Sequence, residues 1–460
     1  MLKVNVNFEK DAVSPKNKNG AVLVELNMNK GKKVKVERKK LNLSLSIDVS
    51  MSMLDKLSRQ MPNYRNSPFI QHPIGDVNNI NNLRNLFVQN QCFAEAPANS
   101  NITKLMQAKK MAIKIVEDLK DGDILSITTF SEVGKVIQEA KVITEANKAL
   151  IIAKINGLNV EGNTNLYDGW ELSAREVAKY VSVKTLNRVI LLTDGVVNQG
   201  LRGTEITSRV EAMTKANIQT TAVGVGEGFQ EDLLSSIAEK GEGNFFFIEK
   251  DEDFSSMLNI EMSGLTDAAL TNVEVSFKSE NAIFKQLNGF KEENSVIKMP
   301  NLKGTKTTEL LLDFELSDKF VFPKKKAKGL GKVMLGTIDV TGIDINGNKV
   351  TYQEEVSIRQ VSDEEWESIE ANGEVVLKKV MLNVALDQQR ASDMILKGNY
   401  VEARTLMAGS AQMLKSEYGD SAIATAMANN IEGGLLKDNN SMSKTMRSAS
   451  YSSRYGLNDE

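Results

Sequence analysis

The sequence has few residues of the kinds that form disulfides or zinc sites. Among its 460 residues there is one cysteine, Cys92, and one histidine, His72. A single cysteine cannot form a disulfide within the chain, and these two residues cannot supply the ligands of a structural zinc site. We therefore expect the protein to work in a reducing compartment, the cytoplasm.

Long apolar runs and a large net charge are also absent from the sequence. No stretch reaches the roughly 18 to 20 apolar residues that a membrane-spanning helix needs, and the N-terminal "MLKVNVNFEKDAV" lacks the apolar segment of a signal peptide. The 57 basic and 60 acidic residues leave a formal charge of −3. We expect neither a membrane span nor nucleic-acid binding, because a nearly neutral chain has no overall attraction for polyanions.

The middle of the chain alternates short apolar runs with segments of helical periodicity. This alternation predicts a doubly wound, Rossmann-like α/β domain with a mostly parallel sheet. Strands are predicted at residues 41–47, 124–130, 188–193, 218–225 and 244–248, with "KVIQEA" as an extra edge strand. Helices are predicted at residues 104–119, 145–155, 168–182, 204–217, 230–240 and 251–263.

The flanks of this domain have the period-two pattern of β-strands. Residues 1–38 contain three such segments, too few to bury an apolar sheet face alone, and residues 266–360 contain several more. We therefore expect one β-sandwich, built from both flanks, into which the α/β domain of residues 39–265 is inserted. A connection at about residues 54–103 is far longer than usual for an α/β unit, and its role is open.

The C-terminal part of the chain is helical in pattern. Residues 361–436 contain two amphipathic segments joined at "KGNY", which predicts a helical hairpin. Residues 437–460 are rich in serine and poor in large apolar side chains, so we expect a disordered tail. The sequence thus predicts a multidomain protein: an α/β domain within a β-sandwich, followed by a helical region.

Polar residues stand at the ends of two predicted strands and in one loop of the α/β domain. The segment "LSLSIDVSMSML" places Asp48, Ser50 and Ser52 after the first strand, Thr164 lies within "GNTNL", and Asp194 ends "VILLTD". Ligands bind at the carboxyl edge of such sheets, so these side chains can converge there. Their oxygen atoms suit Mg²⁺, with Mn²⁺ or Ca²⁺ as alternatives. A sixth position would stay open for water or an incoming carboxylate.

Helix capping and phosphate hydrolysis also use residues of these types. Asp and Ser after a strand often cap helices, and taken alone the first segment favours capping. A metal-dependent phosphohydrolase would also carry Asp after the first strand, but it needs a second Asp where Ser50 stands. Since no His, Lys or Glu stands in the three segments as a general base, we do not expect an enzyme.

These three segments together resemble the metal-ion-dependent adhesion site of von Willebrand factor A (VWA) domains. The resemblance implies that Ser50 and Ser52 bind Mg²⁺ directly, Thr164 directly or through water, and Asp48 and Asp194 largely through water. It also implies a central sheet with one antiparallel edge. Met51 stands where family members usually carry Gly. The layout of strand-rich flanks around the domain is similar to that of inter-alpha-trypsin-inhibitor heavy chains and their bacterial relatives.

The resemblance leads to a function by protein binding. We expect a Mg²⁺-dependent adaptor or scaffold that captures an Asp or Glu carboxylate of a partner protein. Cytosolic relatives of this family often serve AAA+ ATPases of the MoxR kind, so the resemblance implies such a partner. Two alternatives stay open: a structural or assembly protein with a passive VWA scaffold, and a metal-dependent phosphohydrolase.

Overall fold

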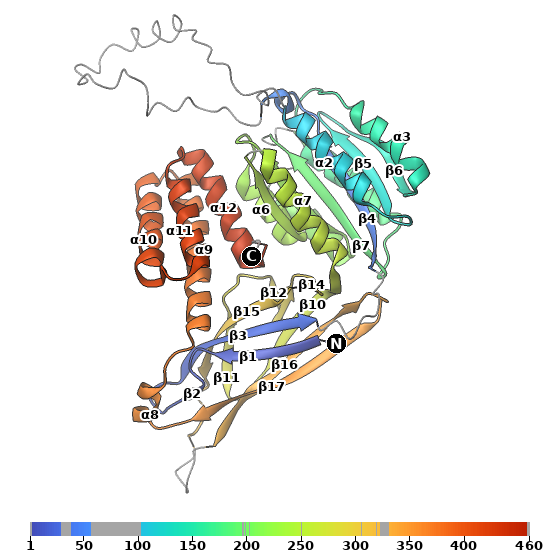
Figure 1. The fold of residues 1–460 in the computed structure, drawn as a ribbon. Coiled ribbons are helices and arrows are strands. Elements are labelled where there is room, and N and C mark those ends of the chain that lie inside the picture. Colours follow the sequence, from blue (N-terminus) through green and yellow to red (C-terminus); the bar gives the residue numbers. More distant parts are fainter. Residues whose placement is uncertain are drawn as a thin grey trace, which may run out of the picture.

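The computed structural model describes residues 2–28, 38–56, 103–195, 197, 199–201, 203–249, 251–304, 306–318, 320–322 and 331–457. They form an α/β region, two further sheets and a group of C-terminal helices (Figure 1). Most of the predicted connection at residues 54–103, with His72 and Cys92, lies outside the described residues.

The α/β region is built on a six-stranded sheet with its first strand near the centre. The strand order is β6 (Gly134–Val142), β5 (Ile124–Phe130), β4 (Lys40–Asp48), β7 (Thr185–Thr193), β8 (Gln219–Val225) and β9 (Glu242–Ile248). All neighbours are parallel except the edge pair of β5 and β6. β4 is buried from Leu41 to Asp48 because it has strands on both sides and helices on both faces.

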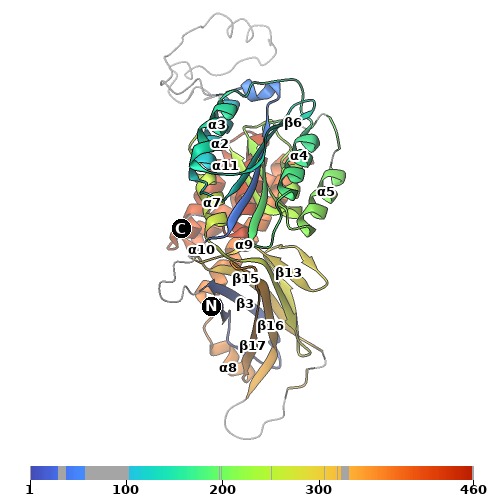
Figure 2. The ribbon, with the colours of Figure 1, turned by 90° about the vertical axis from the view of Figure 1, so that its right-hand side faces the viewer.

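Helices cover both faces of this sheet (Figure 2). One apolar cluster packs against α2 (Lys104–Asp118), α3 (Glu145–Asn156) and α7 (Asp251–Thr266). The cluster on the other face packs against α4 (Leu166–Ala178), α5 (Thr204–Lys215) and α6 (Glu231–Lys240). The predicted α/β architecture and its antiparallel edge are confirmed.

The flanking segments form two sheets below the α/β region (Figure 1). The smaller has the order β1 (Leu2–Phe8), β3 (Asn19–Met28), β15 (Thr308–Leu316) and β11 (Ala282–Gln286). The larger has the order β12 (Glu292–Glu293), β13 (Val296–Met299), β10 (Ala268–Lys278), β16 (Lys332–Asp344), β17 (Lys349–Gln360) and β2 (Ala12–Val13), with β14 (Leu302–Lys303) beside β10. Because β3 pairs with β15, strands from both flanks share one sheet. Side chains of both sheets meet in one apolar cluster.

The C-terminal region is helical, as predicted, but has more helices than the predicted hairpin. α9 (Gly373–Leu396) and α10 (Tyr400–Tyr418) are joined at "KGN", where the sequence placed the hairpin turn. α8 (Asp363–Ser368) precedes them, and α11 (Ala422–Leu435) follows. The boundaries of the five segments drawn from the sequence stay a prediction.

The predicted disordered tail at residues 437–460 is wrong for most of its length, because residues 439–455 form the helix α12 (Asn439–Tyr455). The Asp438 side chain caps its first turn, and Gly456 ends it in a left-handed conformation. Met442, Met446 and Tyr451 are buried. A few well-placed large residues thus anchor the helix, while small serines allow close packing that composition alone does not reveal.

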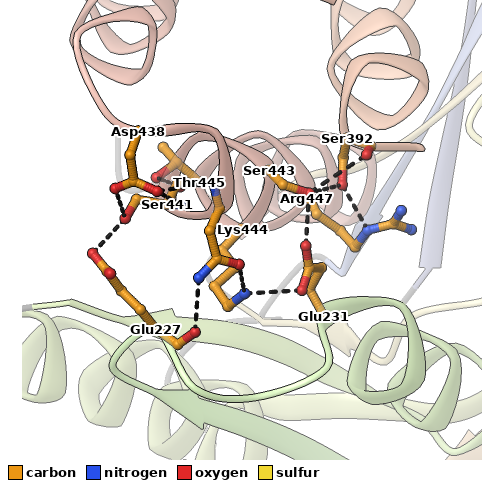
Figure 3. Close-up of polar contacts among 10 residues, drawn as sticks. Glu227, Glu231, Ser392, Asp438, Ser441, Ser443, Lys444, Thr445 and Arg447 are labelled. Atoms are coloured by element: carbon orange, nitrogen blue, oxygen red, sulfur yellow. Dashed lines mark hydrogen bonds and ion pairs between the residues drawn. The ribbon is translucent and has the colours of Figure 1, made fainter. Parts of the chain in front are cut away.

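Polar groups of α12 contact the α/β region between β8 and α6 (Figure 3). Lys444 Nζ lies 3.0 Å from Glu231 Oε2, and Ser443 Oγ donates to Glu231 Oε1 at 2.7 Å. Ser441 Oγ donates to Glu227, whose backbone oxygen accepts from Asn440 at 3.0 Å. α12 therefore joins the C-terminal helices to the α/β region by buried polar contacts as well as apolar ones.

Among the helices of the described residues, none combines the length and apolar character that crossing a membrane requires.

Candidate metal centre

The end of β4 turns sharply around Asp48, the first residue of the predicted site. The backbone N–H of Val49 still donates to Phe130 O of β5 at 2.9 Å, so the strand continues for one residue. Ser50 N then donates to Asp48 Oδ1 at 2.8 Å, and a short 3-10 helix follows at Met51–Leu54. The carboxylate is fully buried and fixes the turn that carries the two serines.

Ser50 and Ser52 extend a line of oxygen atoms away from this turn. Their Oγ atoms lie 3.1 Å apart, and Ser52 Oγ donates to Asp194 Oδ1 at 2.7 Å. Ser50 occupies the N-cap position of the 3-10 helix, but its side chain accepts no capping hydrogen bond. Ser52 Oγ thus contacts Asp194, and Ser50 Oγ contacts Ser52 Oγ instead of a backbone N–H of the helix, which argues against helix capping as their role.

Thr164 reaches the same place through a loop that is bonded to the loop after β4. Glu161 N donates to Val49 O at 2.6 Å, and Met51 N donates to Gly162 O at 3.2 Å. Thr164 is buried. A Cβ atom placed on Gly195 would lie 3.0 Å from Thr164 Oγ1 and 3.6 Å from Ser52 Oγ, so glycine allows these groups to approach.

Asp194 follows β7 and is fully buried at the carboxyl edge of the sheet. The structure thus gathers Asp48, Ser50, Ser52 and Asp194 at one edge, with Thr164 beside them. That these five residues bind a metal stays a prediction.

Two residues at this site were missed by sequence reasoning. Thr193 Oγ1 donates to Asp48 Oδ2 at 2.5 Å, and Lys104 Nζ lies 2.7 Å from Asp194 Oδ2. Thr193 directly precedes Asp194, so its place could have been inferred. Lys104 is the first residue of α2, where the helix dipole disfavours a cation, and that oddity was the available signal.

The presence of Lys104 corrects one sequence argument. The three segments contain no lysine, which is part of the sequence argument against hydrolysis, yet the fold brings Lys104 into the site. Its ammonium group is buried and donates to Asp194, so it acts as a counter-charge.

Burial dominates the electrostatics of Asp48. It raises the pKa of this carboxyl to about 6. Hydrogen bonds from Ser50 and Thr193 lower the pKa and oppose this effect, and the negative charge of Asp194 adds to it. Two buried carboxylates at one edge of the sheet therefore favour a cation there.

The donor set fits a hard divalent ion. It offers carboxylate and hydroxyl oxygens only, the ligands that Mg²⁺, Mn²⁺ and Ca²⁺ prefer. Within the described ranges, no group of three or more His, Cys, Asp or Glu side chains is placed to hold a metal. A site here would therefore depend on its hydroxyl ligands as much as on its two carboxylates.

Sequence comparison identifies the α/β region. Residues 98–260 match the model of the von Willebrand factor type A domain, a range that includes Thr164 and Asp194 but not Asp48, Ser50 or Ser52. The chain is 30% identical over 150 residues to the uncharacterized protein YfbK of Escherichia coli. This match covers 32% of the present chain and 26% of YfbK. It is 28% identical over 175 residues to the uncharacterized protein sll0103 of Synechocystis, a match that covers 36% of the present chain and 40% of sll0103. The matches thus span less than half of either relative.

Solved structures share the fold over nearly the whole chain. A von Willebrand factor type A protein from Catenulispora acidiphila has a TM-score of 0.64 at 14% identity and covers 95% of this chain and 89% of its own. The ArnB paralog VWA2 from Sulfolobus acidocaldarius has a TM-score of 0.57 at 17% identity. The match covers 98% of the present chain and 99% of VWA2. At these identities the likeness concerns the fold alone. The sheet, the helices on both faces and the matched residues show that the chain contains a von Willebrand factor type A domain.

Proposed function

We propose that this protein is a Mg²⁺-dependent adaptor or scaffold that captures a carboxylate of a partner protein. The observation that carries the proposal is the row of oxygen donors from Ser50 through Ser52 to Asp194, with spacings of 3.1 and 2.7 Å at the carboxyl edge of the sheet. VWA domains commonly mediate protein–protein interaction or adhesion, which supports a binding role over catalysis.

The five predicted residues would hold the ion, and their donor chemistry suits Mn²⁺ or Ca²⁺ as well: Asp48, Ser50, Ser52, Thr164 and Asp194. A bound ion of this kind supplies an electrophilic position for an oxygen ligand. Asp48 fixes the loop that carries the serines, and Thr193 holds the second oxygen of Asp48. Asp194 aligns Ser52. These contacts preorganise the donors before any ligand arrives.

Two wider features belong to the same proposal. We infer that the two flanking sheets form one β-sandwich into which the VWA domain is inserted, as in inter-alpha-trypsin-inhibitor heavy chains; the pairing of β3 with β15 and the shared apolar cluster support this. We also infer that the protein acts in the cytoplasm, with a MoxR-type AAA+ ATPase as its partner. The family resemblance supports that partner class.

Binding of the divalent ion can be measured as an increase in the melting temperature of the protein. An ion at 100 times its dissociation constant adds about 2.7 kcal/mol to the free energy of unfolding, which raises the Tm of a domain of this size by roughly 5 to 10 °C. Ser52→Ala should remove most of this increase because it deletes one donor. Asp194→Ala is a poor test, since it would leave the buried Lys104 ammonium unpaired.

Ser46→Ala is the matched control for Ser52→Ala. Ser46 lies on β4, two residues before Asp48, and its buried Oγ has no hydrogen-bond partner among the described residues. This variant should keep the full response to Mg²⁺. A wild-type Tm that is the same in Mg²⁺, Mn²⁺ and EDTA would refute the proposal.

One alternative function has support from a specific observation. The Lys104–Asp194 ion pair gives the site a counter-charge from the protein itself, which is what a passive scaffold in a structural or assembly protein would need. Affinity capture from the host separates the two functions. A carboxylate-binding adaptor recovers its partner in Mg²⁺ but not in EDTA, and Ser52→Ala loses it while Ser46→Ala does not. Recovery that is indifferent to Mg²⁺ and to Ser52 would favour the passive scaffold.

A further inference from the structure

Lys104 is held inside the candidate metal centre by an ion pair of its side chain and a hydrogen bond of its backbone. Its side chain is buried, and Nζ lies 2.7 Å from Oδ2 of the fully buried Asp194. Its backbone N–H donates to Asp55 O at 3.0 Å, which ties the start of α2 to the loop that follows Ser52. A Cβ atom on Gly226 would lie 2.8 Å from Lys104 Cε, so the loop after β8 leaves room for this side chain.

The position is an unfavourable one for a cation. A buried ammonium group loses its hydration, and at the first position of a helix it faces the positive end of the helix dipole. Asp194 offsets these costs by one short ion pair. Because Oδ1 of Asp194 accepts from Ser52 and Oδ2 from Lys104, one carboxylate serves both the donor row and the lysine.

The net charge of the site affects how strongly it binds a divalent ion and how strongly the ion-loaded site binds a carboxylate. Asp48 and Asp194 carry two negative charges, and Lys104 reduces their sum to one. With a divalent ion the site reaches a net charge of +1, whereas without the lysine it would be neutral. A positive site attracts a carboxylate, and a less negative empty site attracts the ion less strongly.

We propose that Lys104 is a specificity-determining residue that weakens binding of the divalent ion and strengthens binding of a carboxylate to the ion-loaded site. The inference rests on the proposed function and names a new role within it. It predicts that removing this one charge moves two affinities in opposite directions. A lysine with only a structural role would change stability and leave both affinities as they are.

The experiment uses the full chain with Mn²⁺ and acetate as probes. Binding of Mn²⁺ alone is measured by electron paramagnetic resonance, and binding of acetate to the Mn²⁺-loaded protein by the loss of water-proton relaxation. Lys104→Met should bind Mn²⁺ at least tenfold more tightly and acetate at least tenfold more weakly than the wild type. Lys104→Arg, which keeps the charge, should restore both affinities toward wild type.

Lys110→Met is the matched control, because Lys110 is an exposed residue of the same helix and its loss changes the net charge equally. It should leave both affinities within about twofold of the wild type, a limit set by screening of exposed charges. If Lys104→Met does not fold, Lys104→Gln replaces it, since an amide can still donate to Asp194.

The outcomes separate this inference from the proposed function. A wild-type protein that binds no Mn²⁺ would refute the metal site itself. A wild type that binds Mn²⁺, together with a Lys104 variant of unchanged or lower Mn²⁺ affinity, would overturn the role of Lys104 alone. Unchanged acetate binding in that variant would overturn it as well.

Discussion

The buried ion pair between α12 and the α/β region gives a sharp prediction about the C-terminal helix. The side chains of Lys444 and Glu231 are 2% and 4% exposed, and Nζ lies 3.0 Å from Oε2. Lys444→Met removes the ammonium but keeps an apolar chain of similar length. Glu231 then stays buried with a hydrogen bond from Ser443 but without its counter-charge.

The structure sets the size of the effect. Breaking a buried pair by removing one partner costs roughly 3 to 5 kcal/mol, because a desolvated charge is left behind. Replacing both partners by apolar residues is often close to neutral. Lys444→Met should therefore lower the free energy of unfolding by roughly 3 to 5 kcal/mol, and the double variant with Glu231→Met should recover most of this loss.

Urea unfolding followed by far-UV circular dichroism measures these changes. Lys415→Met is the matched control, since Lys415 and Glu432 form a pair of 2.7 Å with side chains 41% and 49% exposed. Loss of this exposed ion pair should lower the free energy of unfolding by at most about 1 kcal/mol. The reasoning would be refuted if Lys444→Met were as mild as Lys415→Met, or if the double variant were less stable than both single ones.

Two further predictions concern stability. A Cβ atom on Gly169 of α4 would lie 2.2 Å from Cδ1 of the buried Phe130, so Gly169→Ala should destabilise the protein by about 1 to 3 kcal/mol in thermal melts. An added Cβ on Gly433 of α11 would meet no atom within 4 Å in the described part of the chain beyond its own helical turn, so Gly433→Ala should stabilise the protein by up to about 1 kcal/mol. Equal effects of the two substitutions would contradict the packing argument. Burial lowers the pKa of Lys39 from 10.5 to about 8, so above that pH the folded protein loses this proton while the unfolded chain keeps it. The stability of the wild type relative to Lys39→Met should therefore rise by about 1 kcal/mol per pH unit between roughly pH 8 and 10, and a flat difference over that range would exclude the effect.

Periodicity made most of the α/β region predictable. The strand predicted at residues 124–130 coincides with β5, and the helix predicted at residues 145–155 with α3 to within one residue. Buried strands and amphipathic helices each impose a local spacing of apolar residues, which can be read without knowledge of their neighbours. The prediction of a disordered tail was wrong for the opposite reason: α12 has few large apolar residues, and its polar partners include residues 51 to 55 positions away on α9 and more than 200 positions away in the α/β region.

The sequence by itself determined the α/β architecture and placed Asp48, Ser50, Ser52, Thr164 and Asp194 where strands and loops meet one sheet edge. The carboxyl ends of parallel strands share one edge of the sheet, so Asp48 and Asp194 can be assigned to that edge without coordinates. Only the tertiary structure decided that Lys104 enters the site, 90 positions from Asp194. An ion pair between distant segments depends on how a helix packs over a sheet. The local pattern shows only a lysine at the first position of a helix, and it does not identify the partner of that lysine.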